Sequence, residues 1–482
     1  MTLLARPWPR RLMINSTAIF AGEASTRLAT LFVAIAVARS HGPMALGQYG
    51  YAVAVASVLL LIPDAGLHLC LVRELAADPG RLGPLFWGVN WLKLPLVVAV
   101  LTFSILWGEF VIHDAGRRVL LYLLTARVVL QTFSQAYMAV FKAFERMHFV
   151  AAQQFANTLL VAVWVGAAWW ANASVTLVVL ALVAGQALEM WIGWRIVRRD
   201  FVPGRPNWEG VADLGSMLMA SLPVGAAAIL LALDLRLDIL TLSPFASDRA
   251  LGTFQAAAWF PVGAFLSVSL LMTALFPKLA RHLRSPGAVG NRYVESLLKN
   301  GVLLMAAASV LVWLFAPHLL RLLFGEGVVP AVAALRVLVV ALPCVFINTV
   351  MFHVFVAARR HGAYLTALVL GILLGAPLSL LLSARLGANG TALADVLREV
   401  FVSFVYLCFL KAGNFGQSAA RSLLKVLACA TALIVPTGLL PGFAILGRGA
   451  VPAWVVGWLA GTVAFMGWPR LREMLLLADD DL

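Results

Sequence analysis

Residues 221–242 read Ser221-Leu-Pro-Val-Gly-Ala-Ala-Ala-Ile-Leu-Leu-Ala-Leu-Asp234-Leu-Arg236-Leu-Asp238-Ile-Leu-Thr-Leu242, a hydrophobic run that contains three charged side chains. An apolar run of this length is typical of a helix that spans a membrane. An ionisable residue inside a membrane is costly, so it has either a partner or a function. The stretch therefore predicts a membrane-embedded helix that borders a polar interior.

The whole chain has the composition of an integral membrane protein. Of its 482 residues, 62% are hydrophobic and only 12% are charged, and the mean hydropathy is +0.93. A soluble domain has about 25% charged residues. The apolar runs are long and continuous rather than alternating, which favours helices over an outer-membrane β-barrel.

Hydrophobic segments follow one another along the chain with short connections. They lie at about 13–38, 46–71, 84–107, 117–141, 149–171, 174–195, 211–242, 250–277, 299–320, 330–357, 362–384, 388–410, 420–440 and 451–475. We therefore expect an all-α integral membrane fold with about fourteen transmembrane helices. No connection is long enough to form a large catalytic domain outside the membrane.

Basic residues are distributed unevenly between the connections. About 23 Lys and Arg fall in the two termini and the loops on the same side, against about 7 on the other side, which indicates that the richer side is cytoplasmic. This predicts a multi-pass protein of the cell inner membrane with both termini in the cytoplasm. The same distribution explains the net charge of +14 by membrane topology and by contact with anionic lipid, so no nucleic-acid partner is expected.

Several charged side chains lie inside the predicted spans. Glu23 and Arg27 are four residues apart and share a helix face, so they form either an ion pair or part of a polar interior. Asp64 lies in the second predicted span. Lys93 lies in the third, near the end of the span, so its side chain either faces the polar interior or extends to the lipid headgroups. Arg127, midway along the fourth span, has no carboxylate three or four residues away. It must find another helix, water or an anionic cargo.

Uncharged polar residues extend this pattern. Arg127 shares one face of its predicted helix with Gln131, Ser134 and Gln135. The next span begins with a group of polar side chains, namely Gln153, Gln154, Asn157 and Thr158. Such groups commonly bind helices to one another. Polar stripes on several spans also predict helices that surround a hydrated cavity.

The central triplet has a geometry of its own. In a regular helix Asp234 and Asp238 share a face, whereas Arg236 points nearly to the opposite side and pairs with neither. Aspartates facing the cavity and Arg236 facing it are thus competing predictions. We favour the aspartates, near the periplasmic mouth.

A short repeat indicates how the helices are organised. Leu46-Gly47-Gln48-Tyr49 resembles Leu251-Gly252-Thr253-Phe254, and an apolar span follows each. Two similar pieces in the same orientation predict two parallel six-helix lobes, at residues 1–200 and 201–412, with two further helices in residues 413–482.

Longer motifs lie around the same positions. The first two spans carry Ala38-Arg-Ser-His-Gly-Pro-Met-Ala-Leu-Gly-Gln-Tyr-Gly50, Asp64-Ala-Gly-Leu67 and Leu71-Val-Arg-Glu-Leu-Ala76; later spans carry Leu251-Gly-Thr-Phe-Gln-Ala-Ala257, Ala274-Leu-Phe-Pro-Lys-Leu-Ala280 and Leu320-Arg-Leu-Leu-Phe-Gly325. Together they resemble the motifs of polysaccharide flippases of the O-antigen type, which belong to the multidrug/oligosaccharidyl-lipid/polysaccharide exporter superfamily. Small departures occur, such as Phe254 in place of the usual Tyr.

The resemblance implies a two-lobed transporter, not an enzyme. It would move an undecaprenyl-diphosphate-linked oligosaccharide from the cytoplasmic to the periplasmic leaflet by alternating access, for O-antigen or exopolysaccharide export. A diphosphate in hydrocarbon must exchange its hydration for cationic partners. The predicted substrate-binding residues are Arg27, Lys93, Arg127 and Arg236, and those predicted to balance charge or couple ions are Glu23, Asp64, Asp234 and Asp238. We expect no cofactor or metal, coupling to a proton or sodium gradient, and a polysaccharide polymerase or chain-length protein as a candidate partner.

Two other classes of protein remain open at this point. A drug or organic-cation exporter of the same superfamily would favour a cavity rich in carboxylates and aromatic rings, and Arg127 and Lys93 count against it. A membrane-embedded polysaccharide polymerase or ligase would place catalytic residues in a large periplasmic loop, which the sequence does not contain.

Overall fold

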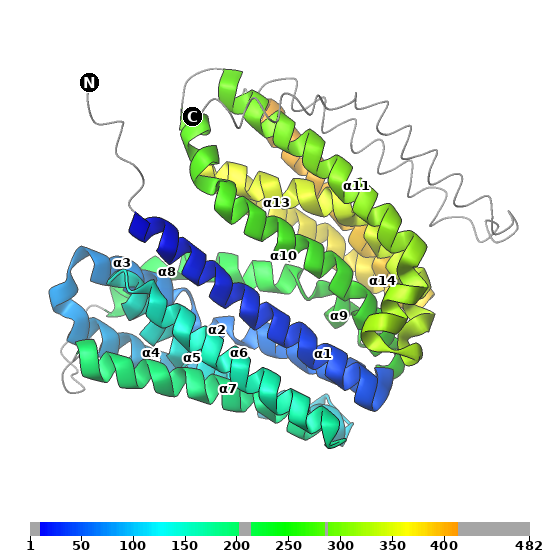
Figure 1. The fold of residues 1–482 in the computed structure, drawn as a ribbon, viewed down its shortest axis with the longest axis horizontal. Coiled ribbons are helices and arrows are strands. Elements are labelled where there is room, and N and C mark those ends of the chain that lie inside the picture. Colours follow the sequence, from blue (N-terminus) through cyan, green and yellow to red (C-terminus); the bar gives the residue numbers. More distant parts are fainter. Residues whose placement is uncertain (1–9, 202–213, 285–287, 413–482) are drawn as a thin grey trace, which may run out of the picture. The chain divides into compact units, whose positions relative to one another are not determined.

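The computed structural model describes residues 10–201, 214–284 and 288–412. Within these ranges the chain forms helices joined by short turns and contains no strand (Figure 1). The predicted all-α membrane fold is thereby confirmed. The two spans predicted at 420–440 and 451–475, and with them the C-terminal addition at 413–482, lie outside the described residues.

The described chain divides into two compact units. Unit 1 contains the described residues up to Leu240 together with Ser247–Gly252, and unit 2 contains Thr241–Ala246 and the described residues from Thr253 onward. Unit 1 therefore extends beyond residue 200, where the first lobe was predicted to end. The reason is that α8 (Leu214–Asp234) packs against α2 (Leu61–Asp64) and α3 (Leu67–Ala77) of unit 1.

Unit 1 is a bundle of long helices that lie side by side (Figure 1). Besides α2, α3 and α8 its elements are α1 (Arg10–Leu59), η1 (Pro79–Arg81), α4 (Leu82–Phe110), α5 (Ala115–Ala143), α6 (Met147–Trp170), α7 (Val175–Ile196), the π-helical turn η2 (Val197–Phe201), and α9 (Leu237–Leu242), of which the residues up to Leu240 belong to this unit. The helix α1 packs against α5 and α6, and both of these pack against α7.

A kink divides α1 into two crossings. Gly42 takes a φ of 78°, a left-handed value that favours glycine, and Pro43 follows it. Proline has no N–H to donate and disfavours helical geometry in the residue before it, so the sequence itself fixes the kink. The first arm corresponds to the span predicted at 13–38, whereas the span predicted at 46–71 is divided between the second arm, α2 and the first part of α3.

Two pairs of glycines let backbones approach closely within unit 1. A Cβ on Gly66, in the break between α2 and α3, would lie 2.9 Å from the carbonyl oxygen of Ser221 and 3.0 Å from the nitrogen of Gly225 on α8. A Cβ on Gly252 would overlap the carbonyl oxygen of Pro43 and lie 2.6 Å from the nitrogen of Gly47. The two glycines of the sequence repeat therefore face each other.

The central triplet does not lie on one regular helix. The helix α8 ends at Asp234, Leu235 and Arg236 form a turn, and α9 begins at Leu237. The single span predicted over residues 211–242 is wrong in this respect. The backbone N–H of Arg236 still donates to the carbonyl of Leu233, and its carbonyl accepts from Leu240, so the backbone of Arg236 keeps its hydrogen bonds in the turn. Helical periodicity consequently does not relate Arg236 to the two aspartates.

Unit 2 contains α10 (Asp248–Arg284) from Thr253 onward, α11 (Ala288–Phe324), η4 (Glu326–Ala331), α12 (Val332–Leu338), η5 (Val339–Ala341), α13 (Leu342–Ala357) and α14 (His361–Ala412). The helix α13 packs against both α11 and α14, and its residues Ile347, Val350 and Val354 are completely buried. A positive φ of 59° at Gly387 kinks α14 and separates the spans predicted at 362–384 and 388–410.

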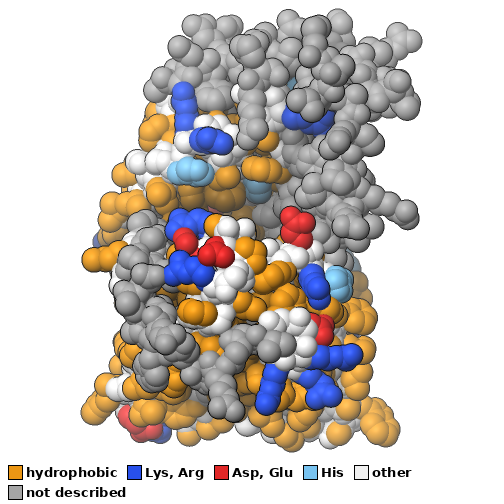
Figure 2. Space-filling model, turned by 90° about the vertical axis from the view of Figure 1, so that its left-hand side faces the viewer, with side chains coloured by type: hydrophobic (Ala, Val, Ile, Leu, Met, Phe, Trp, Pro, Cys, Tyr) orange, Lys and Arg blue, Asp and Glu red, His pale blue; other side chains and the backbone are white. Residues whose placement is uncertain are grey.

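The helices are long and apolar enough to cross a membrane. The described residues contain nine such segments, of which Ala24–Ala77 with 54 residues and His361–Leu410 with 50 residues are each long enough for two crossings. Large apolar side chains are exposed on them, including Phe110 at 76% and Trp170 at 91%. Figure 2 shows a face on which hydrophobic side chains cover broad areas between small groups of charged ones. Such a surface suits lipid rather than water, and the chain is a multi-pass membrane protein.

Candidate functional site

Three arginines of unit 1 form what we term the arginine cluster, namely Arg27 of α1, Arg127 of α5 and Arg236 of the turn between α8 and α9. The charges of Arg27 and Arg236 repel each other, and Arg127 and Arg236 both act electrostatically on the hydroxyl of Tyr49 in α1. The structure thus brings together three of the four predicted substrate-binding residues. They come from three separate parts of the sequence.

Among the residues that the structure describes, no carboxylate is in direct contact with the guanidinium groups of this cluster. Among the described residues, none of the three makes a side-chain hydrogen bond or an ion pair within 4 Å. Arg27 is exposed, whereas Arg127 and Arg236 are half-buried and their nitrogen atoms are not among the buried atoms without a partner. The cluster therefore presents positive charge to accessible space.

Tyr49 interacts electrostatically with two of the three arginines, Arg127 and Arg236. Its side chain is completely buried, and its hydroxyl oxygen has no hydrogen-bond partner among the described residues. A buried hydroxyl without a partner is uncommon and costs stability. Tyr49 belongs to the Leu46-Gly47-Gln48-Tyr49 repeat, which predicted how the helices are organised but not that Tyr49 interacts with arginines.

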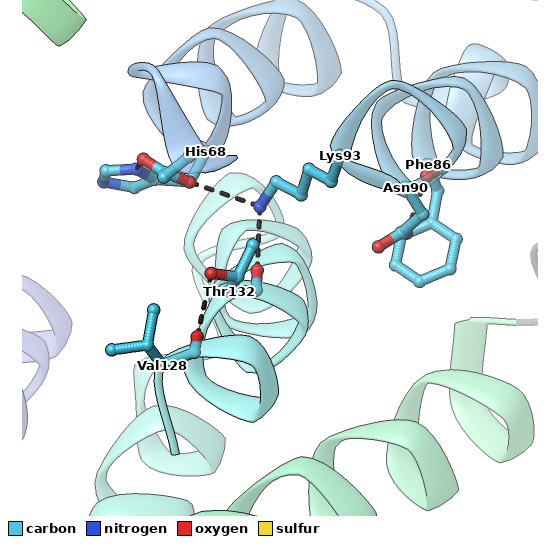
Figure 3. A network of polar contacts seen from close by, with 7 residues as sticks. His68, Phe86, Asn90, Lys93, Val128 and Thr132 are labelled. Carbon is cyan, nitrogen blue, oxygen red and sulfur yellow. Dashed lines mark hydrogen bonds and ion pairs between the residues drawn. The ribbon is translucent and has the colours of Figure 1, made fainter. Parts of the chain in front are cut away.

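Lys93, the fourth predicted substrate-binding residue, belongs to a buried ion pair. Its Nζ is 3.2 Å from Asp64 Oδ1 and donates to the carbonyl oxygen of Thr132 at 2.8 Å (Figure 3). The lysine side chain is completely buried. Asp64 also binds Nδ1 of His68, one turn later in the chain. In this state both Lys93 and Asp64 are occupied by protein partners, and Lys93 does not extend to a surface.

The remaining predicted carboxylates have different positions. Asp234 is half-buried at the last residue of α8. Asp238 is half-buried in the first turn of α9, accepts a hydrogen bond from the backbone of Ile239, and interacts electrostatically with Arg236. Glu23 lies on α1 one turn before Arg27, and its side chain lies outside the described set. Asp238 thus interacts electrostatically with Arg236, although regular helical spacing predicted that the two side chains point to opposite sides.

Sequence reasoning missed one buried carboxylate. Glu189 on α7 is 4% exposed and binds polar side chains of α5 and α6. It lies inside the span predicted at 174–195, so the rule that singled out Arg127 would have found it. The same bonds agree with the prediction that polar residues at the start of α6 bind helices together. Among the described residues, no group of three or more His, Cys, Asp or Glu is placed to hold a metal ion.

This architecture is shared with known membrane transporters. One match is the lipid II flippase MurJ in an inward closed conformation, with a TM-score of 0.69, 13% identity, and coverage of 94% of this chain and 98% of that one. A second is an inward-facing multidrug resistance MATE transporter of the MOP superfamily, with a TM-score of 0.67, 16% identity, and coverage of 85% and 99%. A third is the eukaryotic MATE transporter AtDTX14, with a TM-score of 0.60, 13% identity, and coverage of 86% and 98%. At these identities the likeness establishes the fold alone.

The family is established independently of the structures. Residues 12–283, more than half of the chain, match the polysaccharide biosynthesis protein family. The chain belongs to this family, as the flippase-like motifs predicted. A comparison with curated proteins found no match.

Proposed function

We propose that this protein flips an undecaprenyl-diphosphate-linked oligosaccharide from the cytoplasmic to the periplasmic leaflet by alternating access. It does so in the cell inner membrane with both termini in the cytoplasm, and it supplies O-antigen or exopolysaccharide synthesis. A polysaccharide polymerase or a chain-length protein is the expected downstream partner. Family membership and the fold support a transporter for a lipid-linked glycan.

The arginine cluster is the observation that carries the choice of cargo. A guanidinium group donates two parallel hydrogen bonds to a phosphate and stays charged at any physiological pH. Positive charge inside a membrane is expensive when it has no counter-ion. The guanidinium groups of Arg27, Arg127 and Arg236 have no directly bound carboxylate among the described residues, so an anionic cargo supplies what they lack. A diphosphate offers two such groups at a spacing that a cluster can bind together.

The same observation disfavours export of organic cations. A cationic drug near these arginines would meet like charge, which costs free energy in a medium of low dielectric constant. Two of the described carboxylates that could offset this are already engaged. Asp64 is paired with Lys93 and His68, and Asp238 interacts with Arg236.

The carboxylates have a separate role in the proposal. Asp234 and Asp238 flank Arg236 in sequence and balance its charge when the cargo is absent. Asp64 and Glu23 are the candidates for coupling transport to a proton or sodium gradient. Lys93 remains a predicted cargo ligand only if its pair with Asp64 opens during transport.

Binding to the purified protein distinguishes these cargo classes. We would measure the affinity of the detergent-solubilised protein for a prenyl-diphosphate sugar, for the same sugar on an uncharged prenyl chain, and for tetraphenylphosphonium as an organic cation. The diphosphate should bind most tightly, and its affinity should fall as salt screens the arginines. Preference for tetraphenylphosphonium would overturn the proposal and favour an efflux transporter. If the uncharged lipid binds as tightly as the diphosphate, the arginine cluster does not contribute to recognition of the cargo.

A further inference from the structure

Unit 2 contains an arginine, Arg336 of α12, in a segment that is long and apolar enough to cross a membrane. Among the described residues Arg336 forms no ion pair, and its side chain makes one hydrogen bond, from Nε to the carbonyl oxygen of Trp313 on α11 at 3.4 Å. The terminal nitrogens Nη1 and Nη2 therefore have no described partner. A charge inside a membrane is costly, so it has either a partner or a function.

A proline explains why Nε of Arg336 is held at this place. Pro317 lies inside α11, four residues after Trp313. Proline has no N–H, so the carbonyl oxygen of Trp313 lacks the hydrogen bond that the helix would otherwise give it. Arg336 supplies this bond. An uncharged side chain or a water molecule would satisfy the same carbonyl oxygen. The hydrogen bond thus explains the position of the guanidinium group but not its charge.

The indole ring of Trp313 lies against this guanidinium group. The guanidinium carbon of Arg336 is 4.4 Å from the centre of the ring, a cation–π contact that arginine favours. The indole Nε1 is buried and has no hydrogen-bond partner among the described residues, although a buried indole N–H usually has one. Both side chains of the pair therefore carry donors that lack an acceptor.

The pair faces the protein rather than the lipid. The large apolar side chains that α11 exposes nearby, Leu311 at 57% and Phe315 at 54%, lie two residues before and after Trp313 and point to the other side of the helix. Ala306 and Leu320, seven residues before and after Trp313, share its side and are buried. The two side chains of the pair are themselves half-buried, so a ligand can reach the guanidinium group.

We propose that Arg336 binds the carboxylate of an acidic sugar in the glycan of the cargo, and that Trp313 and Pro317 position it. This inference rests on the proposed function. A guanidinium group binds a carboxylate through two parallel hydrogen bonds, which Nη1 and Nη2 of Arg336 can donate. The arginine cluster of unit 1 is the proposed site for the diphosphate, and Arg336 of unit 2 adds selectivity for the sugar. The diphosphate is the other anion of the cargo that this chemistry fits, and the experiment distinguishes the two.

Two probes that differ in one charge test the proposal. They are short-chain prenyl diphosphates that carry the same disaccharide, which ends in glucuronate in one probe and in the methyl ester of glucuronate in the other. Titration calorimetry of the purified full-length protein at neutral pH gives the affinity for each probe. The wild type should bind the glucuronate probe about tenfold to about a hundredfold more tightly, as expected for hydrogen bonds to a charged group. Added salt should reduce this preference.

Matched variants connect the preference to Arg336. Arg336→Gln keeps an uncharged donor for the carbonyl oxygen of Trp313, and it should bind both probes with the affinity that the wild type has for the methyl ester. Arg336→Lys keeps the charge without the two parallel donors, so its preference should be reduced. Arg321→Gln is the control, since Arg321 also lies in unit 2 but is paired with Glu326 at 2.6 Å, and this variant should keep the full preference.

Several results would overturn the inference while leaving the proposed function intact. One is equal affinity of the wild type for the two probes, and another is an Arg336→Gln variant that keeps the preference. If Arg336→Gln weakens the binding of both probes equally, Arg336 contacts the diphosphate rather than a sugar. If Arg336→Gln does not fold, an undiminished preference in Arg336→Lys would contradict the proposal. Failure of the wild type to bind either probe would instead count against the proposed function.

Discussion

Removal of Lys93 is the perturbation whose cost the structure determines most directly. The ammonium group is completely buried, and its described partners are Asp64 Oδ1 at 3.2 Å and the carbonyl oxygen of Thr132 at 2.8 Å. Lys93→Met would leave the Asp64 carboxylate inside the bundle with His68 as its remaining described partner. Loss of one member of a buried ion pair costs about 3–5 kcal/mol. Because His68 still binds Asp64, we expect about 3 kcal/mol, at the lower end of that range.

A double-mutant cycle measures this pair without its desolvation cost. Asp64→Asn should destabilise the protein by a similar amount, since it leaves a buried ammonium group with uncharged partners. The double variant Lys93→Met with Asp64→Asn has no buried charge at this position and should recover to within about 1 kcal/mol of the wild type. As a control, Lys299→Met breaks a lysine–glutamate pair whose lysine is 40% exposed, and should cost at most about 1 kcal/mol.

The assay is thermal unfolding of the purified protein in detergent, with the folded fraction measured by size-exclusion chromatography after heating. Lys93→Met with full wild-type stability, or a double variant no more stable than either single one, would refute the reasoning. The double variant also tests the predicted role of Lys93 in cargo binding. If it folds and transports normally, Lys93 is a structural residue; if it folds and does not transport, the predicted role is supported.

Three further changes address the cluster and the helix contacts. Arg127→Ala should lower the affinity for the diphosphate cargo by about tenfold to about a hundredfold with little change in stability, because charge-assisted hydrogen bonds contribute about 1.5–3 kcal/mol. Arg127→Lys should have an intermediate affinity. If the Ala variant binds the cargo as tightly as the wild type, Arg127 has no role in the mechanism. Gly252→Val should destabilise unit 1 by at least about 1–3 kcal/mol through overlap with the neighbouring backbone, whereas Gly263→Val, where a Cβ meets nothing within 4 Å, should fold normally in the same unfolding assay. Gly42→Ala should lower the free energy of unfolding by about 1–2 kcal/mol because alanine is strained at the positive φ of this position. Gly362→Ala serves as the control, since no positive φ is present there. Equal melting temperatures of these two variants would contradict this account of the kink.

The sequence predicted the membrane helices well because their signal is local. Hydropathy along twenty residues is enough to locate a crossing, and the spans predicted up to residue 410, except that at 211–242, lie on described helices. The kink at Gly42 also follows from neighbouring residues, since glycine precedes proline there. By contrast, the turn at Leu235 and Arg236 lies in a run of helix-forming residues. Nothing in the local pattern opposes a continuous helix, so the prediction for residues 211–242 failed.

The candidate site was predictable only in part, for a related reason. Arg127 could be identified as unpaired within its own helix because helical spacing excludes local partners, and the structure agrees that no described side chain binds it. The pair between Lys93 and Asp64 joins residues from different helices, so no spacing rule reveals it. The electrostatic link between Arg27 and Arg236 likewise depends on how α1 and α8 pack. Tertiary packing, rather than pattern, selects these partners.

Transbilayer movement of a fluorescent undecaprenyl-diphosphate oligosaccharide in proteoliposomes tests the proposed function most directly. Lipid that has reached the outer leaflet is detected with an impermeant quencher, and an uncharged undecaprenyl-linked sugar serves as the comparison. The account predicts movement of the diphosphate-linked lipid by the wild type, and loss of that movement in a variant with Arg127→Ala and Arg236→Ala that still folds. Equal movement by the wild type and this variant, or no movement by the wild type, would contradict it.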